Sequence, residues 1–116
     1  MDTVINKATA YTVRIKLYVP TRDKKDAVLS AIDVRKYTNR AMKLFVSCNV
    51  QTVNHEKFAD VSGDCNNEVC VTVESFLTVS EAREAEAKIL AFLQDMKREL
   101  FQNYIALEIN NSMYTI

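Results

Sequence analysis

The hydrophobic positions of this chain change period several times along its length. Over residues 11–19 every second position is apolar, and Arg14, Lys16 and Tyr18 lie between the apolar ones. This alternation is typical of a strand with one buried face. Apolar residues at helical spacing predict a helix that begins at Thr21 or Asp23 and ends at about residue 39 or runs on through Ala41 and Met42. They predict a second helix that begins at the cap Ser80. The predicted strands lie at residues 11–19, 44–52, 69–77 and 104–109.

The order strand, helix, strand, strand, helix, strand predicts an α+β domain. Its four-stranded antiparallel sheet would have the strand order 4-1-3-2, with two helices on one face. This βαββαβ order resembles the ferredoxin-like split βαβ sandwich in topology only. We expect residues 1–116 to form one domain, with residues 1–9 an irregular lead-in and residues 54–67 a long connection between strands. Because that fold serves many purposes, it does not give the function.

The composition removes several classes of function. The chain has a single glycine and a single proline, so it lacks the glycine-rich loops that bind phosphate groups. No apolar run is long enough for a membrane span, and the N-terminus does not resemble a signal peptide, so we expect a soluble cytoplasmic protein that does not act at membranes. Three cysteines, an odd number, are expected to be reduced thiols.

One face of the predicted sheet carries no helix and is the first candidate site. Its two central strands present few aromatic residues, which does not favour single-stranded RNA binding. We expect the cations Arg14 and Lys16 to pair across strands with Glu74 and Glu108. A second copy of the protein covering this face is the favoured interpretation, which predicts a homodimer. The candidate interface residues are Arg14, Lys16, Tyr18, Phe45, Asn49 and Gln51.

A basic segment near the end of the first predicted helix is the second candidate site. Its cations surround an aromatic side chain and could bind a phosphate backbone, which gives nucleic acid as a possible partner that is not favoured. A helix end that carries solvated cations explains the same pattern. The residues of this basic segment are Arg35, Lys36, Tyr37, Arg40 and Lys43.

Catalytic and metal-binding motifs are absent from the sequence. His55 is the single histidine and has no specific partner in its vicinity, and the spacing of Cys65 and Cys70 is not that of a zinc site. No metal, no cofactor and no catalytic residue is therefore predicted. The sequence favours a non-catalytic binding module that acts through protein–protein interaction as a homodimer. The two alternatives are nucleic-acid binding through residues 35–43, and a small-ligand sensor or sequestering protein with its site at the dimer seam.

Overall fold

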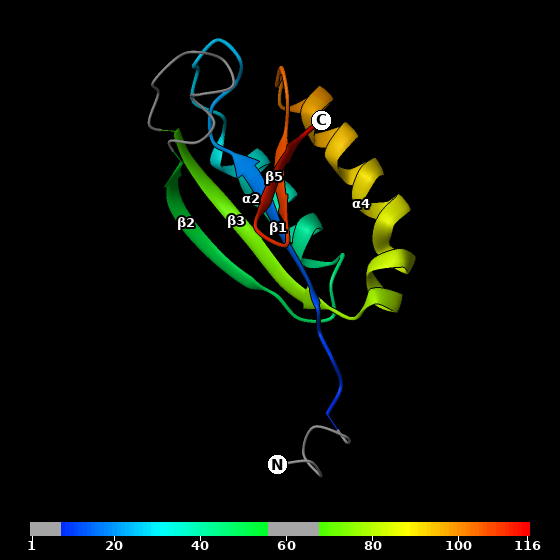
Figure 1. Cartoon of the computed structure of the whole chain (residues 1–116). Helices are drawn as coiled ribbons and strands as arrows, with labels where there is room; N and C mark the ends of the chain where they lie inside the picture. The colour runs from blue at the N-terminus through cyan, green and yellow to red at the C-terminus, as the bar shows by residue number, and fades with distance from the viewer. Residues whose placement is uncertain (1–7, 56–67) are drawn as a thin grey trace.

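A single antiparallel sheet and two helices make up the part of the chain that the structure, a computed structural model, describes, residues 8–55 and 68–116. Most of the expected lead-in, and residues 56–67 of the expected connection, lie outside this description. The strands are β1 (Val13–Pro20), β2 (Asn49–His55), β3 (Glu68–Leu77), β4 (Ala106–Ile109) and β5 (Ser112–Thr115). The helices are α2 (Ala31–Met42) and α4 (Val79–Glu99). The strand order is β2-β3-β1-β4-β5 (Figure 1).

The number of strands corrects the predicted architecture. The class is α+β, but the four-stranded βαββαβ prediction is wrong because the sheet formed by the described residues has five strands. After β4 the chain turns back at Asn110 and Asn111, and β5 pairs with β4 as the new edge strand. Ile105 and Ile116 continue this hairpin through two backbone hydrogen bonds of 2.9 and 2.8 Å. A strand of four residues with mostly exposed side chains has no clear alternation, so the pattern did not indicate it.

Both helices pack on the sheet face that carries the odd-numbered residues of β1. Ile15, Leu17 and Val19 join the buried side chains of both helices in one hydrophobic core, in which α4 contributes Phe92, Leu93 and Met96 among others. The even-numbered residues of β1 therefore project from the opposite face, which we call the open face. Within the described residues, neither helix combines the length and apolar character that a membrane span requires.

The first helix begins later than the pattern predicts. Its N-cap is Ser30, whose hydroxyl accepts the backbone N–H of Asp33 at 3.1 Å, and neither Thr21 nor Asp23 caps it. Asp23 instead accepts the backbone N–H groups of Lys25 and Ala27 with one carboxylate oxygen, at 2.8 and 3.0 Å. A side chain that accepts hydrogen bonds from nearby backbone N–H groups competes with helix formation. Residues 21–29 accordingly form a loop.

The second helix is capped by Thr78, two residues before the predicted cap Ser80. The Thr78 hydroxyl accepts the backbone N–H of Glu81 at 3.1 Å, and the Glu81 carboxylate accepts the N–H of Thr78 at 2.9 Å. This reciprocal arrangement is a capping box. Ser80 lies inside the helix and is exposed.

We expect Thr78→Ala to lower the free energy of unfolding by about 1 kcal/mol, because the backbone N–H of Glu81 loses its side-chain acceptor. The control Ser80→Ala should change that free energy by less than about 0.5 kcal/mol, since its hydroxyl caps nothing. Urea denaturation of both variants measures the difference. Equal losses in the two variants would contradict the assignment of the cap.

Candidate functional site

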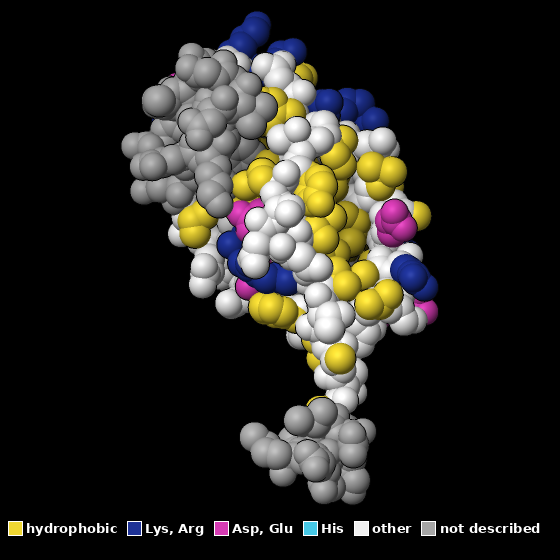
Figure 2. Space-filling view, in the orientation of Figure 1, with side chains coloured by type: hydrophobic (Ala, Val, Ile, Leu, Met, Phe, Trp, Pro, Cys, Tyr) yellow, Lys and Arg dark blue, Asp and Glu magenta, His cyan; other side chains and the backbone are white. Residues whose placement is uncertain are grey.

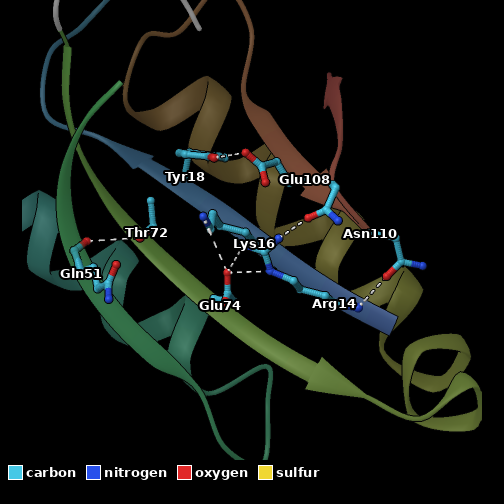
Figure 3. A network of polar contacts seen from close by, with 9 residues as sticks. Arg14, Lys16, Tyr18, Gln51, Thr72, Glu74, Glu108 and Asn110 are labelled. Atoms are coloured by element: carbon cyan, nitrogen blue, oxygen red, sulfur yellow. Dashed lines mark hydrogen bonds and ion pairs between the residues drawn. The ribbon is translucent and has the colours of Figure 1, made fainter. Parts of the chain in front are cut away.

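The open face carries a group of polar side chains centred on β1. The strand register places Tyr18 opposite Thr72 on β3, and Lys16 between Glu74 on β3 and Glu108 on β4. Figure 3 shows these side chains on the sheet face turned away from the helices. We call this group the polar cluster. Its members are Arg14, Lys16, Tyr18, Thr72, Glu74, Glu108, Asn110 and Asn111.

Arg14, Lys16 and Glu74 form the open end of the polar cluster. Arg14 donates from Nε and Nη2 to Oε2 of Glu74 at 2.9 and 2.6 Å, and Lys16 Nζ lies 3.6 Å from the same oxygen. The hydrogen bond to Glu74 raises the pKa of the Arg14 guanidinium above its usual value. The three side chains are 19–28% exposed. Among the described residues, no hydrogen bond ends on Oε1 of Glu74, so one carboxylate oxygen remains available to a ligand.

Tyr18 and Glu108 form the closed end of the polar cluster. The Tyr18 hydroxyl donates to the Glu108 carboxylate, and the two residues are only 2% and 8% exposed. Burial raises the pKa of Tyr18 well above its usual range, and the hydrogen bond and the charge of Glu108 raise it further. Around Tyr18, Cys70 and Ala106 are buried as a small second core. The phenol is therefore held neutral beside a carboxylate, and this hydrogen-bonded pair is the buried part of the polar cluster.

The candidate interface residues are only partly where the sequence placed them. Arg14, Lys16 and Tyr18 do lie on the open face, and Asn49 and Gln51 lie on its edge strand β2, opposite Glu74 and Thr72. The Thr72 hydroxyl donates to the backbone oxygen of Gln51 at 3.4 Å. The expectation that two copies pair through this face is not tested by a single chain and stays a prediction.

Phe45 is not on the open face, and its assignment there is wrong. The side chain is buried in the main core on the helix side of the sheet. The predicted strand 44–52 begins only at Asn49, because α2 runs to Met42 and its C-cap Lys43 leads into a turn. The apolar residues over 44–48 alternate as in a strand, but this segment packs against the core and does not pair with another strand.

The basic segment is largely neutralised by α4. Tyr37 is buried, and its hydroxyl donates to the Glu99 carboxylate. Lys36 lies 3.4 Å from Glu99, and Arg40 lies 3.1 Å from Asp95. The hydrogen bond from Arg40 lowers the pKa of Asp95. These contacts join the two helices. Arg35 and Lys43 are the segment's cations that lack an acidic partner among the described residues, which leaves little continuous positive surface for a nucleic acid.

A second candidate site is an apolar groove on the helix side of the sheet. It encloses about 390 Å³ between α4 and strands β1 and β4, and its lining includes Ile15, Ile89 and Leu107. Arg83 and Glu86 are its charged lining residues. Figure 2 shows hydrophobic side chains gathered between α4 and the β4–β5 hairpin. The sequence predicts that the apolar faces of these elements are buried in the core. Periodicity does not show where a gap remains between a helix and a sheet.

The candidate site residues predicted from the sequence did not include the turn residues Asn110 and Asn111, nor the cluster members Thr72, Glu74 and Glu108. Asn110 Oδ1 accepts the backbone N–H of Arg14 at 2.8 Å, and Asn111 Oδ1 accepts from the Arg14 guanidinium. An Asn-Asn pair between two short runs of strand-forming residues is a turn signal, and it was available in the sequence. No pattern in the sequence indicated that the turn would lie against Arg14.

Two solved structures have a similar fold. A phage SAM lyase in complex with S-methyl-5′-thioadenosine superposes with a TM-score of 0.58 at 15% sequence identity, over 95% of this chain and 92% of that chain. A phage SAM lyase in the apo state superposes with a TM-score of 0.52 at 11% identity, over 95% and 93% of the two chains. At these identities the likeness shows the fold alone. Neither a protein-family model nor a curated protein matches the sequence.

These neighbours correct the functional interpretation of the sequence. Both neighbours are enzymes, which points against the prediction of a non-catalytic module that acts by protein binding and against the prediction that the chain is not an enzyme. The error has a physical reason. Catalytic motifs are visible in a sequence only when their residues lie within one short segment, whereas Lys16, Glu74 and Glu108 come together only through strand pairing.

Proposed function

We propose that the protein is a lyase that cleaves SAM (S-adenosylmethionine) and releases S-methyl-5′-thioadenosine, with the polar cluster as its substrate site. The observation that carries this proposal is the Glu74 carboxylate. Arg14 holds its Oε2, while no hydrogen bond among the described residues ends on its Oε1, at the open end of the cluster. The fold shared with a SAM lyase over 95% of the chain supports SAM as the substrate.

The charges of the polar cluster suit SAM better than the apolar groove does. SAM carries a sulfonium, an ammonium and a carboxylate, and the cluster offers Glu74 for a cation and Lys16 for an anion. Moving such charges into an apolar groove would cost several kcal/mol unless each one found a partner. The groove offers only Arg83 and Glu86 among its lining residues. We therefore assign the substrate to the open face.

Release of S-methyl-5′-thioadenosine requires cleavage of the bond between sulfur and Cγ of the methionine portion. The electron pair of that bond stays on sulfur, so the sulfonium becomes a neutral thioether. Since a lyase adds no water, Cγ must replace its lost bond to sulfur with a new bond to another atom of the methionine portion. Either the substrate's own carboxylate attacks Cγ and a lactone forms, or a β-proton leaves and a double bond forms. The identity of the four-carbon product distinguishes these two routes.

The role of Glu74 follows from which substrate charges persist during the reaction. The sulfonium charge disappears in the transition state, so a carboxylate placed beside it would stabilise the substrate more than the transition state. The ammonium group keeps its charge throughout. We therefore assign Oε1 of Glu74 to the ammonium group, where it orients the amino-acid portion toward Cγ. In the elimination route the same oxygen would accept the β-proton.

The direct test is to incubate the purified protein with SAM and to follow S-methyl-5′-thioadenosine by liquid chromatography and mass spectrometry. We expect release well above the rate in buffer alone. S-Adenosylhomocysteine, which lacks the sulfonium charge, should remain intact because its leaving group would be an anion. Release at the buffer rate would contradict the proposed function.

A second comparison tests where the substrate binds. We expect Lys16→Gln to reduce the rate of cleavage by about tenfold, because the substrate carboxylate loses its cation. Leu90→Gln in the apolar groove should leave the rate unchanged. The reverse pattern would move the site to the groove.

A further inference from the structure

The turn between β4 and β5 contacts Arg14 at three points. The backbone N–H of Arg14 donates to Asn110 Oδ1 at 2.8 Å, and the backbone N–H of Asn110 donates to the Arg14 carbonyl oxygen at 2.9 Å. The third contact runs from Nη1 of Arg14 to Oδ1 of Asn111. The first two contacts hold the backbone of β1 beyond the last β1–β4 pair, Ile15 and Ile109. The third holds the guanidinium itself.

The Asn111 side chain accepts a hydrogen bond from Arg14 that the turn itself does not require. Ile109 pairs with Ser112, so the loop has two residues, and φ is positive at both, 49° at Asn110 and 72° at Asn111. Such loops favour glycine at the second position, because a Cβ there is strained. A glycine at 111 would therefore suit the turn at least as well as asparagine. What it would remove is the acceptor for Arg14.

The contact with Asn111 sets how Arg14 can approach Glu74. A guanidinium and a carboxylate pair best with two parallel hydrogen bonds that engage both oxygens. In this structure Nε and Nη2 both donate to Oε2 at 2.9 and 2.6 Å, while Nη1 is taken by Asn111. Asn111 thus holds the guanidinium at a third point, besides its two contacts with Oε2 of Glu74. In this arrangement the hydrogen bonds from Arg14 to Glu74 end on Oε2 and not on Oε1.

We propose that Asn111 is a positioning residue that fixes the Arg14 guanidinium and thereby keeps Oε1 of Glu74 available to the ammonium group of the substrate. This inference rests on the proposed function, because it assigns a consequence for SAM cleavage. Without the Asn111 acceptor, Arg14 engages both oxygens of Glu74. The substrate then binds with its amino-acid portion displaced, and a small displacement at the reacting atoms slows the reaction strongly.

The variant Asn111→Gly separates the turn from the contact. We expect its melting temperature to equal or exceed that of the wild type, while kcat for SAM cleavage falls about tenfold and KM changes by less than about threefold. Asn111→Asp keeps an acceptor oxygen at the same place and should restore kcat to within about threefold of the wild type. A purely structural role would lower stability in Asn111→Gly and would leave kcat unchanged in a folded sample.

A measurement that does not depend on activity accompanies the kinetics. In ¹⁵N-edited NMR spectra of the full chain, the Arg14 Nε–Hε signal should be sharp and protected from exchange in the wild type and in Asn111→Asp. In Asn111→Gly the rotation of the guanidinium should become faster. If the wild type does not cleave SAM, the proposed function has failed and these spectra alone decide whether Asn111 restrains Arg14.

Three results would overturn the inference. The first is an unchanged kcat in Asn111→Gly when the wild type is active. The second is an Arg14 signal that does not change between the wild type and Asn111→Gly. The third is a large loss of stability in Asn111→Gly, which would show that the asparagine side chain supports the turn itself.

Discussion

We expect Glu74→Gln to lower kcat/KM for SAM cleavage by about 100- to 1,000-fold, the range typical for the loss of an orienting or proton-accepting group. The amide keeps the shape of the carboxylate and still offers an oxygen to Arg14. It lacks the negative charge that would hold the ammonium group of the substrate, and it does not accept a β-proton. Initial rates of S-methyl-5′-thioadenosine release, measured over a range of SAM concentrations, determine the loss.

The matched control is Glu84→Gln, the same change at an exposed position of α4. It should leave kcat and KM at wild-type values. Because Glu74 is only about four-fifths buried and its ion pairs are partly solvated, we expect the melting temperature of Glu74→Gln to change by only a few degrees. A folded Glu74→Gln that keeps most of the wild-type activity would remove the polar cluster from the proposed mechanism.

The largest effect on stability is expected at Tyr18. Tyr18→Phe should lower the free energy of unfolding at pH 7 by about 2 kcal/mol, because the buried Glu108 carboxylate loses a hydrogen-bond donor. Both side chains are nearly inaccessible to water, so solvent does not replace the lost bond. Urea denaturation measures the loss. The control Tyr11→Phe, at a position that is 55% exposed, should have little effect.

The same phenol makes stability depend on pH at the alkaline end. Its folded pKa lies above the ordinary value of 10.0, since burial and Glu108 disfavour the phenolate. Above pH 10 the unfolded chain therefore releases this proton while the folded chain retains it. The stabilisation is complete below pH 10 and declines as the pH rises further. The wild type should lose more stability than Tyr18→Phe between pH 9 and about pH 11, and parallel losses would contradict a raised pKa.

The candidate site was half predictable from the sequence. The alternation of β1 placed Arg14, Lys16 and Tyr18 on one face, because successive side chains of a strand point to opposite sides. Pairing of these two cations with Glu74 and Glu108 was also expected, and in the structure both cations pair with Glu74. For Glu108 the structure gives Tyr18 as a partner, a pairing that the sequence did not suggest. Opposite charges on adjacent strands indicate an ion pair, whereas the sequence gives no sign that a buried phenol will donate a hydrogen bond to a carboxylate.

The basic segment shows why a local charge pattern is weak evidence. Four cations within nine residues suggested a phosphate-binding surface. The acids that neutralise Lys36 and Arg40 lie more than 50 residues later in the chain, on α4. Helix packing brings them together, and that packing depends on the core around Tyr37 and Phe92. Ion pairs between residues so far apart in the chain cannot be recognised from a local charge pattern.

What the sequence determined by itself were features that arise within one element. It fixed the side-chain alternation of β1, the apolar face of α4 and the α+β class, because each follows from a short-range period. What only the tertiary structure decided were the features that need two distant segments: the fifth strand, the burial of Phe45, and a carboxylate from β3 held by Arg14 beside the Asn110–Asn111 turn. These depend on strand register and on the path of the chain between elements, which no local period encodes.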